Sequence, residues 1–252
     1  MNPNKVSSSK IGSGQTPAGR LLTPAALMII ICSSVSVPAQ TRIGSVAFHR
    51  SATAAAASSA PILSADGRTV AFLSAANNLV TNDDLGTSVD VFVRDLPSGR
   101  TTLASVNLTG VGGGNDYSGV PGLSADGRLI VFESTASNLV ADDTNGVADV
   151  FVRDLATGQT RLVSVPASGQ GSANGPSTAP LISADGRWVF FESAASDLVT
   201  TITEPAPQLY ARDLVAGVTV LISADTTAAV PPALVAVTVT FSVLPTSLEL
   251  TL

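Results

Sequence analysis

The stretch Leu63-Ser64-Ala65-Asp66-Gly67-Arg68 recurs twice along the chain, as residues 123–128 and 182–187, at spacings of 60 and 59 residues. A short sequence that returns at a fixed period is the signature of a repeat protein, in which each copy forms one supersecondary unit. The sequence therefore predicts three tandem copies of one structural unit.

A second repeated stretch divides each unit further. It reads Val91-Phe92-Val93-Arg94-Asp95-Leu96 in the first unit, returns as residues 150–155, and returns more loosely as 209–214. Together with residues 69–74, residues 101–106 and the apolar residues before Ser64, it makes four short strands per unit. Ala-Asp-Gly between two apolar runs predicts a tight hairpin, because Gly67 adopts positive φ without steric cost.

Composition agrees with short strands and tight turns. Charged residues make up 13% of the chain, and it contains 21 glycines and 15 prolines. Many short strands joined by Gly- and Pro-containing turns favour an all-β fold over long helices.

The order of these motifs resembles a known family. Ser-Ala-Asp-Gly-Arg, an apolar strand, Asn-Leu-Val, an acidic loop ending in Asp-Val-Phe-Val-Arg-Asp-Leu, and Leu-Val-Ser-Val together resemble the WD-like, TolB-like β-propeller repeats of bacterial exported proteins, over residues 41–224. The resemblance implies an all-β, propeller-like array of three four-stranded blades and no single activity. The units run over about 41–100, 101–159 and 160–218, with a further outer-strand copy at 219–224 and another at 41–46.

Closure of the array is left open by the sequence. Propellers close with about four to eight blades, and an open array exposes two sheet edges. Residues 225–252 form a β-rich tail in which Val235, Val237, Val239, Phe241 and Val243 alternate with small or polar residues. Three alternatives follow: the array is incomplete, the C-terminal strands complete it, or two chains join as a homodimer.

The first 39 residues have the pattern of a secretory signal peptide. Basic residues precede an apolar run from Ala25 to Cys32, and Val37-Pro38-Ala39 suits cleavage after Ala39. The run is too short for a membrane anchor, the alternative interpretation. Lipidation at Cys32, the only cysteine, is a further alternative. The sequence therefore predicts export to the periplasm or outside the cell, with no membrane span in the mature chain.

Charge restricts the partners of the predicted mature chain. All 19 acidic residues follow residue 39, together with 10 arginines and no lysine. An acidic chain without a cationic stripe is not expected to bind nucleic acid or anionic membranes. Cations or neutral polymers are the expected partners.

One acidic loop has the spacing of a metal site. Asp143, Asn145 and Asp149 surround the turn-forming Gly146 in the second unit. Calcium takes about six to eight oxygen ligands, often from alternate positions around a glycine. The pattern predicts a calcium site, and the competing interpretation is a solvated turn in which Asp and Asn bond to their own backbone.

Residues that recur in every unit are expected to be structural, since a catalytic group is rarely needed three times. This applies to the Arg-Asp pairs that begin at Arg94, Arg153 and Arg212, and no catalytic residue is assigned. Glu133, Glu192, the lone His49 and the Asp143 loop are the candidates if the chain is an enzyme.

The sequence therefore predicts an exported, non-enzymatic scaffold that binds a protein or polysaccharide through its blade-end loops and is stabilised by calcium. Two alternatives remain: a propeller domain of, or accessory to, a hydrolase or polysaccharide lyase, and a truncated propeller fragment.

Overall fold

A computed structural model describes residues 53–83, 88–200 and 207–223. All of them belong to one compact unit of the chain. The proposed signal peptide, the strand copy at 41–46, His49 and the tail at 225–252 lie outside the described residues. Within them, no helix has the length and apolarity needed to cross a membrane.

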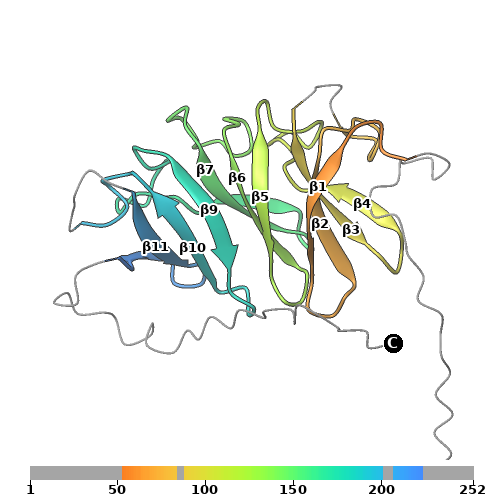
Figure 1. The fold of residues 1–252 in the computed structure, drawn as a ribbon. Coiled ribbons are helices and arrows are strands. Elements are labelled where there is room, and N and C mark those ends of the chain that lie inside the picture. The colour runs from red at the N-terminus through yellow and green to blue at the C-terminus, as the bar shows by residue number, and fades with distance from the viewer. Residues whose placement is uncertain (1–52, 84–87, 201–206, 224–252) are drawn as a thin grey trace, which may run out of the picture. The chain divides into compact units, whose positions relative to one another are not determined.

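The described residues form three four-stranded antiparallel sheets, in which consecutive strands are neighbours (Figure 1). The first sheet contains β1 (Ser58–Leu63), β2 (Thr69–Ser74), β3 (Asp90–Asp95) and β4 (Arg100–Leu103). The second contains β5 (Ser118–Leu123), β6 (Leu129–Ser134), β7 (Asp149–Asp154) and β8 (Gln159–Leu162). The third contains β9 (Ser177–Ile182), β10 (Trp188–Ser193), β11 (Gln208–Asp213) and β12 (Val218–Leu221). This is the predicted all-β array of three four-stranded blades.

The sheets cross the repeat boundaries at 100, 159 and 218. The outer strands β4, β8 and β12 come from residues at or just beyond those boundaries and pair with β3, β7 and β11. The copy predicted at 219–224 thus supplies most of the outer strand of the third sheet.

The hairpin between the first two strands of each sheet is held by the repeated Ser-Ala-Asp-Gly-Arg. In the second sheet, the Ser124 hydroxyl donates to Asp126 Oδ1 at 2.6 Å and accepts the Leu129 N–H at 2.9 Å. Asp126 Oδ1 also accepts the Arg128 N–H at 3.0 Å, and Gly127 has a φ of 69°. Each residue type therefore has a local task, which explains why the motif recurs.

The core lies between the sheets. Alternation along a strand sends Val91 and Val93 of β3 to one face, where they pack against Phe132 and Phe151 of the second sheet. Phe132 and Phe151 stack with ring centroids 5.8 Å apart, and Phe191 and Tyr210 of the third sheet repeat this pair at 5.8 Å. Each inter-sheet junction thus buries the same aromatic pair against aliphatic side chains.

The inner strands contain a bulge that sequence reasoning missed. Ala60, Val120 and Ala179 have positive φ values of 49°, 45° and 53°, and each lies within a register shift between the first two strands of its sheet. Each of these residues precedes a proline, so the repeated Ala-Pro or Val-Pro was the available signal. At Ala179 the backbone N–H leaves the ladder and donates to Glu133 of the neighbouring sheet at 2.8 Å.

Candidate functional site

The structure brings the predicted calcium ligands together at the end of the second sheet. Asp143 and Asn145 lie in the loop before β7, and Asp149 is the first residue of that strand. The Asn145 side-chain amide donates to Asp149 Oδ2 and to the carbonyl of Ala173, both at 2.7 Å. Asn145 Oδ1 accepts the Val147 N–H at 3.0 Å. In this geometry the nitrogen of Asn145, and not its oxygen, faces Asp149.

Asp149 is fully buried. Its Oδ1 accepts a hydrogen bond from the Ser164 hydroxyl, which in turn accepts the Val150 N–H at 3.1 Å. Burial raises the pKa of Asp149 from 3.8 to about 7, and the neighbouring Asp143 carboxylate adds to the rise. Asp149 therefore holds a proton at mildly acidic pH.

Asp143 lies 6% exposed beside it. Burial also raises the pKa of Asp143, against hydrogen bonds from the Asn145 backbone and Ser172 that lower it. Its Oδ1 is buried and has no hydrogen-bond partner among the described residues. Two buried carboxyl groups, one with an unsatisfied oxygen, thus share this loop.

Only part of this arrangement is particular to the second sheet. In the first sheet the Ser105 hydroxyl donates to Asp90 Oδ1 at 2.6 Å, and in the third sheet Ser223 bonds Gln208 in the same way. The bond between the first residue of the third strand and the serine after the outer strand therefore ties strands together in every unit. Asp143 and Asn145 are the local addition. Among the described residues, no group of three or more His, Cys, Asp or Glu side chains is placed to hold a metal ion.

A second candidate is a cavity of about 730 Å³ around the outer edge of the first sheet. Its wall includes Arg94, Arg100 and Arg153, the hydroxyls of Thr101 and Thr102, and loop residues at 79–82, 106 and 110. None of the described residues that line it is acidic, although acidic residues outnumber basic ones in the chain by 19 to 13. The charged residues in the described lining are therefore arginines, which the acidic overall charge of the chain did not predict.

Two of these arginines occupy equivalent positions in successive sheets. Arg94 Nη1 donates to Thr101 Oγ1 at 2.7 Å, and Arg153 Nη1 donates to Thr160 Oγ1 at 2.8 Å. Burial lowers the pKa of Arg153, yet a guanidinium stays charged at any physiological pH. Arg153 Nε is buried without a hydrogen-bond partner, and neither Arg153 nor Arg100 pairs with a carboxylate of the described residues. Their charge is thus available to an anionic ligand.

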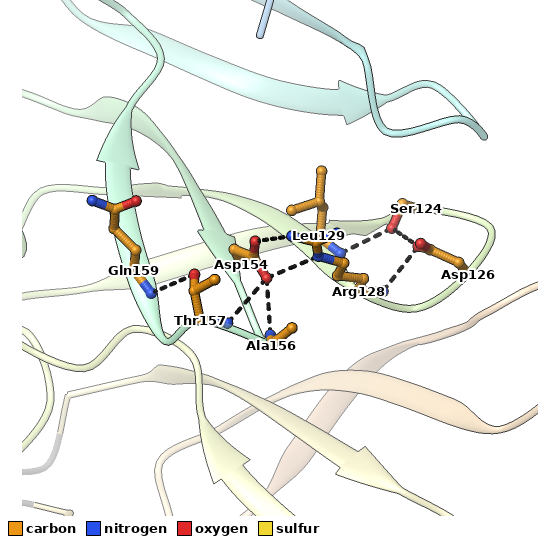
Figure 2. A network of polar contacts seen from close by, with 8 residues as sticks. All are labelled: Ser124, Asp126, Arg128, Leu129, Asp154, Ala156, Thr157 and Gln159. Atoms are coloured by element: carbon orange, nitrogen blue, oxygen red, sulfur yellow. Dashed lines mark hydrogen bonds and ion pairs between the residues drawn. The ribbon is translucent and has the colours of Figure 1, made fainter. Parts of the chain in front are cut away.

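The arginine and aspartate of each repeated Arg-Asp pair have different partners, because adjacent strand residues point to opposite faces. Figure 2 shows Asp154 bonded to Arg128 of the preceding hairpin, with Nη2 to Oδ2 at 2.6 Å and Nε to Oδ1 at 3.1 Å. Hydrogen bonding to Arg128 lowers the pKa of Asp154, and Arg187 lowers that of Asp213 to about 2. The Arg–Asp bond occurs in both the second and the third sheet and links neighbouring strands. The aspartates of these pairs therefore have a structural role.

The acidic residues proposed for catalysis are dispersed. Glu133 Oε2 accepts the Ala179 N–H of the neighbouring sheet at 2.8 Å, and Glu192 occupies the equivalent, exposed position on β10. The structure thus places Glu133 and Glu192 on different sheets, and the Glu133 carboxylate is hydrogen-bonded to a backbone N–H.

Comparison with known proteins finds no matching family model and no matching curated protein. Among solved structures, the chain is similar to TolB from Acinetobacter baumannii, with 18% identity, a TM-score of 0.40, and coverage of 67% of this chain and 32% of that one. It is similar to the β-propeller domain of the Trilobed protease from Pyrococcus furiosus, with 14% identity, a TM-score of 0.42 and coverage of 67% and 43%. A putative TolB from Agrobacterium tumefaciens gives 15% identity, a TM-score of 0.40 and coverage of 69% and 64%. The chain therefore spans less than two thirds of the length of each of these proteins.

Proposed function

We propose that this chain is an exported, non-enzymatic binding scaffold that holds an acidic polysaccharide in the cavity lined by Arg94, Arg100 and Arg153. The observation that carries the proposal is the gathering of Arg94, Arg100 and Arg153 in a wall whose described lining residues include no Asp or Glu. Arginine recognises carboxylate and sulfate groups through paired, charge-assisted hydrogen bonds. The threonine hydroxyls and Asn82 in the same wall supply partners for sugar hydroxyls.

Export is supported by the signal-like residues 1–39. A non-enzymatic role is supported by the structural tasks of the repeated carboxylates, which hold hairpins and strands. Hydrolase or lyase activity that disappears when Glu133 or His49 is changed to Ala would instead favour the enzyme.

The binding proposal is tested by calorimetry with alginate oligomers, which carry a carboxylate on each sugar, and with neutral dextran oligomers of equal length. We expect alginate alone to bind, more weakly as salt rises. Arg100 is exposed, so Arg100→Gln is expected to leave the fold intact and weaken alginate binding by about tenfold or more. Arg161→Gln, an exposed arginine of β8 outside this cavity, is the matched control. Equal binding of both polymers, or equal effects of the two substitutions, contradicts the proposal, and binding of acidic peptides alone redirects it to a protein partner.

A second candidate function is calcium binding at Asp143, Asn145 and Asp149, favoured by the buried, unpartnered oxygen of Asp143. Rotation of the Asn145 amide would turn its oxygen, in place of its nitrogen, toward Asp149, so that Asp143, Asn145 and Asp149 would each offer an oxygen to the ion. Protons compete with a metal for carboxylates, so calcium at millimolar concentration should raise the melting temperature more at pH 8 than at pH 5. Asp143→Asn should abolish the difference. Absence of both heat and thermal stabilisation on titrating metal-free protein would reject calcium.

A further inference from the structure

The two junctions between the three sheets repeat one set of backbone hydrogen bonds. The hairpin alanines join in series: Ala65 N–H donates to the carbonyl of Ala125 at 3.0 Å, and Ala125 N–H donates to that of Ala184 at 2.9 Å. The inner strands join similarly, with Ser118 N–H donating to the carbonyl of Val89 at 2.9 Å and Ser177 N–H to that of Ala148 at 2.7 Å. The junction is therefore a repeated interface with fixed donors and acceptors.

Side chains at the junctions repeat as well. Gly127 fits against Thr69 of the first sheet so closely that a Cβ would lie 2.6 Å from Thr69 Oγ1. Gly186 fits against Leu129 of the second sheet, where a Cβ would lie 2.9 Å from Leu129 Cδ1. The hairpin glycine of each following sheet thus receives the first side chain of the second strand of the sheet before it.

The third sheet presents the same groups again. Ala184 N–H, the equivalent of the donors on Ala65 and Ala125, has no hydrogen-bond partner in the described part of the chain. Glu192 occupies the position of Glu133, which accepts the Ala179 N–H. The Glu192 carboxylate accepts no backbone N–H from a neighbouring sheet within the described ranges. Pro207 precedes the third strand of its sheet, as Val89 and Ala148 do, so its carbonyl is equivalent to the two carbonyls that accept at the junctions.

The first sheet presents the complementary groups. Ala65 supplies a carbonyl equivalent to the acceptors on Ala125 and Ala184, and Ser58 is equivalent to the donors Ser118 and Ser177. Ala60 has a positive φ like that of Ala179, whose N–H donates to Glu133, so the Ala60 N–H is the equivalent donor. Gly67 has open space, a recess, at the position where Gly127 and Gly186 contact the sheet before them. Trp188 is the side chain of the third sheet equivalent to Thr69 and Leu129, which fill those recesses.

The same face of the third sheet exposes apolar side chains. Leu209 is 38% exposed, whereas its counterpart Val150 in the second sheet is fully buried at the junction with the third. Leu181, which pairs with Phe190 on β10, is 59% exposed. Among the described residues, this surface thus has the composition of a junction but no sheet packed on it.

We infer that the third sheet of one chain docks on the first sheet of a second copy, forming a junction of the same design as the two within the chain. A second copy is the occupant because each donor, acceptor and recess that the third sheet requires occurs on the first sheet of this chain. Such a contact joins two different surfaces of the chain. When a twofold axis relates two chains, each third sheet meets the first sheet of the other chain, and the ring of sheets closes. Two copies then contribute six sheets, within the range of about four to eight blades in closed propellers.

The test measures mass by light scattering and the emission of Trp188, the only tryptophan, as the full chain is diluted. We expect a dimer that dissociates on dilution, with the Trp188 emission changing at the same concentration. Leu181→Arg and Leu209→Arg lie on the exposed face, so they should leave the monomer folded and abolish the dimer. Val111→Arg, a 77% exposed position on the loop between the first and second sheets, is the matched control and should dimerise normally.

Two further variants test the register of the junction. Glu192→Gln removes the charge that assists the bond to the Ala60 N–H and should weaken dimerisation by about tenfold. The double variant Ala65→Cys and Ala184→Cys, with Cys32→Ser, should form disulfides between chains on oxidation. A monomer at all concentrations, a dimer unaffected by the arginine substitutions, or disulfides within one chain would each overturn the inference.

Discussion

Asp149→Asn offers a quantitative test of the buried carboxyl at the start of β7. The carboxyl is fully buried, and burial raises its pKa from 3.8 to about 7. A group whose pKa is higher in the folded state binds its proton more tightly there, so folding is favoured at low pH and this contribution is lost as pH rises through 7. The wild-type protein should therefore lose stability between pH 5 and pH 8, and the asparagine variant should lose less.

The magnitude follows from the size of the rise. One pKa unit corresponds to about 1.36 kcal/mol, so moving from 3.8 to about 7 amounts to up to about 4 kcal/mol. About 2.5 kcal/mol of this falls between pH 5 and pH 8, because Asp149 is mostly protonated at the first pH and mostly ionised at the second. Against a typical total stability of about 5 to 15 kcal/mol, such a change is easily measured.

Urea unfolding at half-unit pH steps gives the two stability curves. Their difference removes the groups that titrate alike in both proteins and leaves the contribution of Asp149 together with its coupling to the neighbouring Asp143. An asparagine at this position can accept the Asn145 amide through its oxygen, and its NH2 group can donate to the Ser164 hydroxyl oxygen once that hydroxyl rotates, so the variant should fold. Parallel curves from pH 5 to pH 8, or a wild-type protein that gains stability relative to the variant over that range, would refute the assignment of a buried, protonated carboxyl.

Three further predictions concern the sheets. Gly127→Ala should destabilise the dilute protein by about 1 to 3 kcal/mol more than Gly67→Ala, because both substitutions strain a positive φ but only the first also produces a close contact; equal losses in urea unfolding would contradict this. Arg128→Ala should destabilise the protein only slightly, and less in high salt, since its ion pair with Asp154 leaves the arginine side chain 55% exposed and open to screening by salt; a large, salt-independent loss of stability in urea unfolding would show a different role. Phe151→Ala should cost about 3 to 5 kcal/mol, because its fully buried ring packs between two sheets, and thermal unfolding that leaves its melting temperature unchanged would argue against that packing.

Local chemistry explains why much of the fold was predictable. The Ser-Ala-Asp-Gly-Arg hairpin is held by bonds among residues at most five positions apart, so its sequence suffices to predict it. The continuous apolar run Val91-Phe92-Val93 likewise predicts a strand with two apolar faces, which is the form buried between sheets. The inner-strand bulge at Ala179 had a local signal in the following Pro180, but its partner Glu133 is 46 residues away, and no local pattern predicts that hydrogen bond.

The sequence by itself determined the number of repeats, the strands and the turns, since these depend on residue types within a few positions of each other. Only the tertiary structure decided which of the acidic side chains is buried and which arginines meet in one cavity. Asp149 and Asp154 belong to the same strand, yet burial raises the pKa of the first and hydrogen bonding to Arg128 lowers that of the second. Desolvation and charge pairing depend on neighbours that folding brings from other strands and sheets, and no local pattern records them.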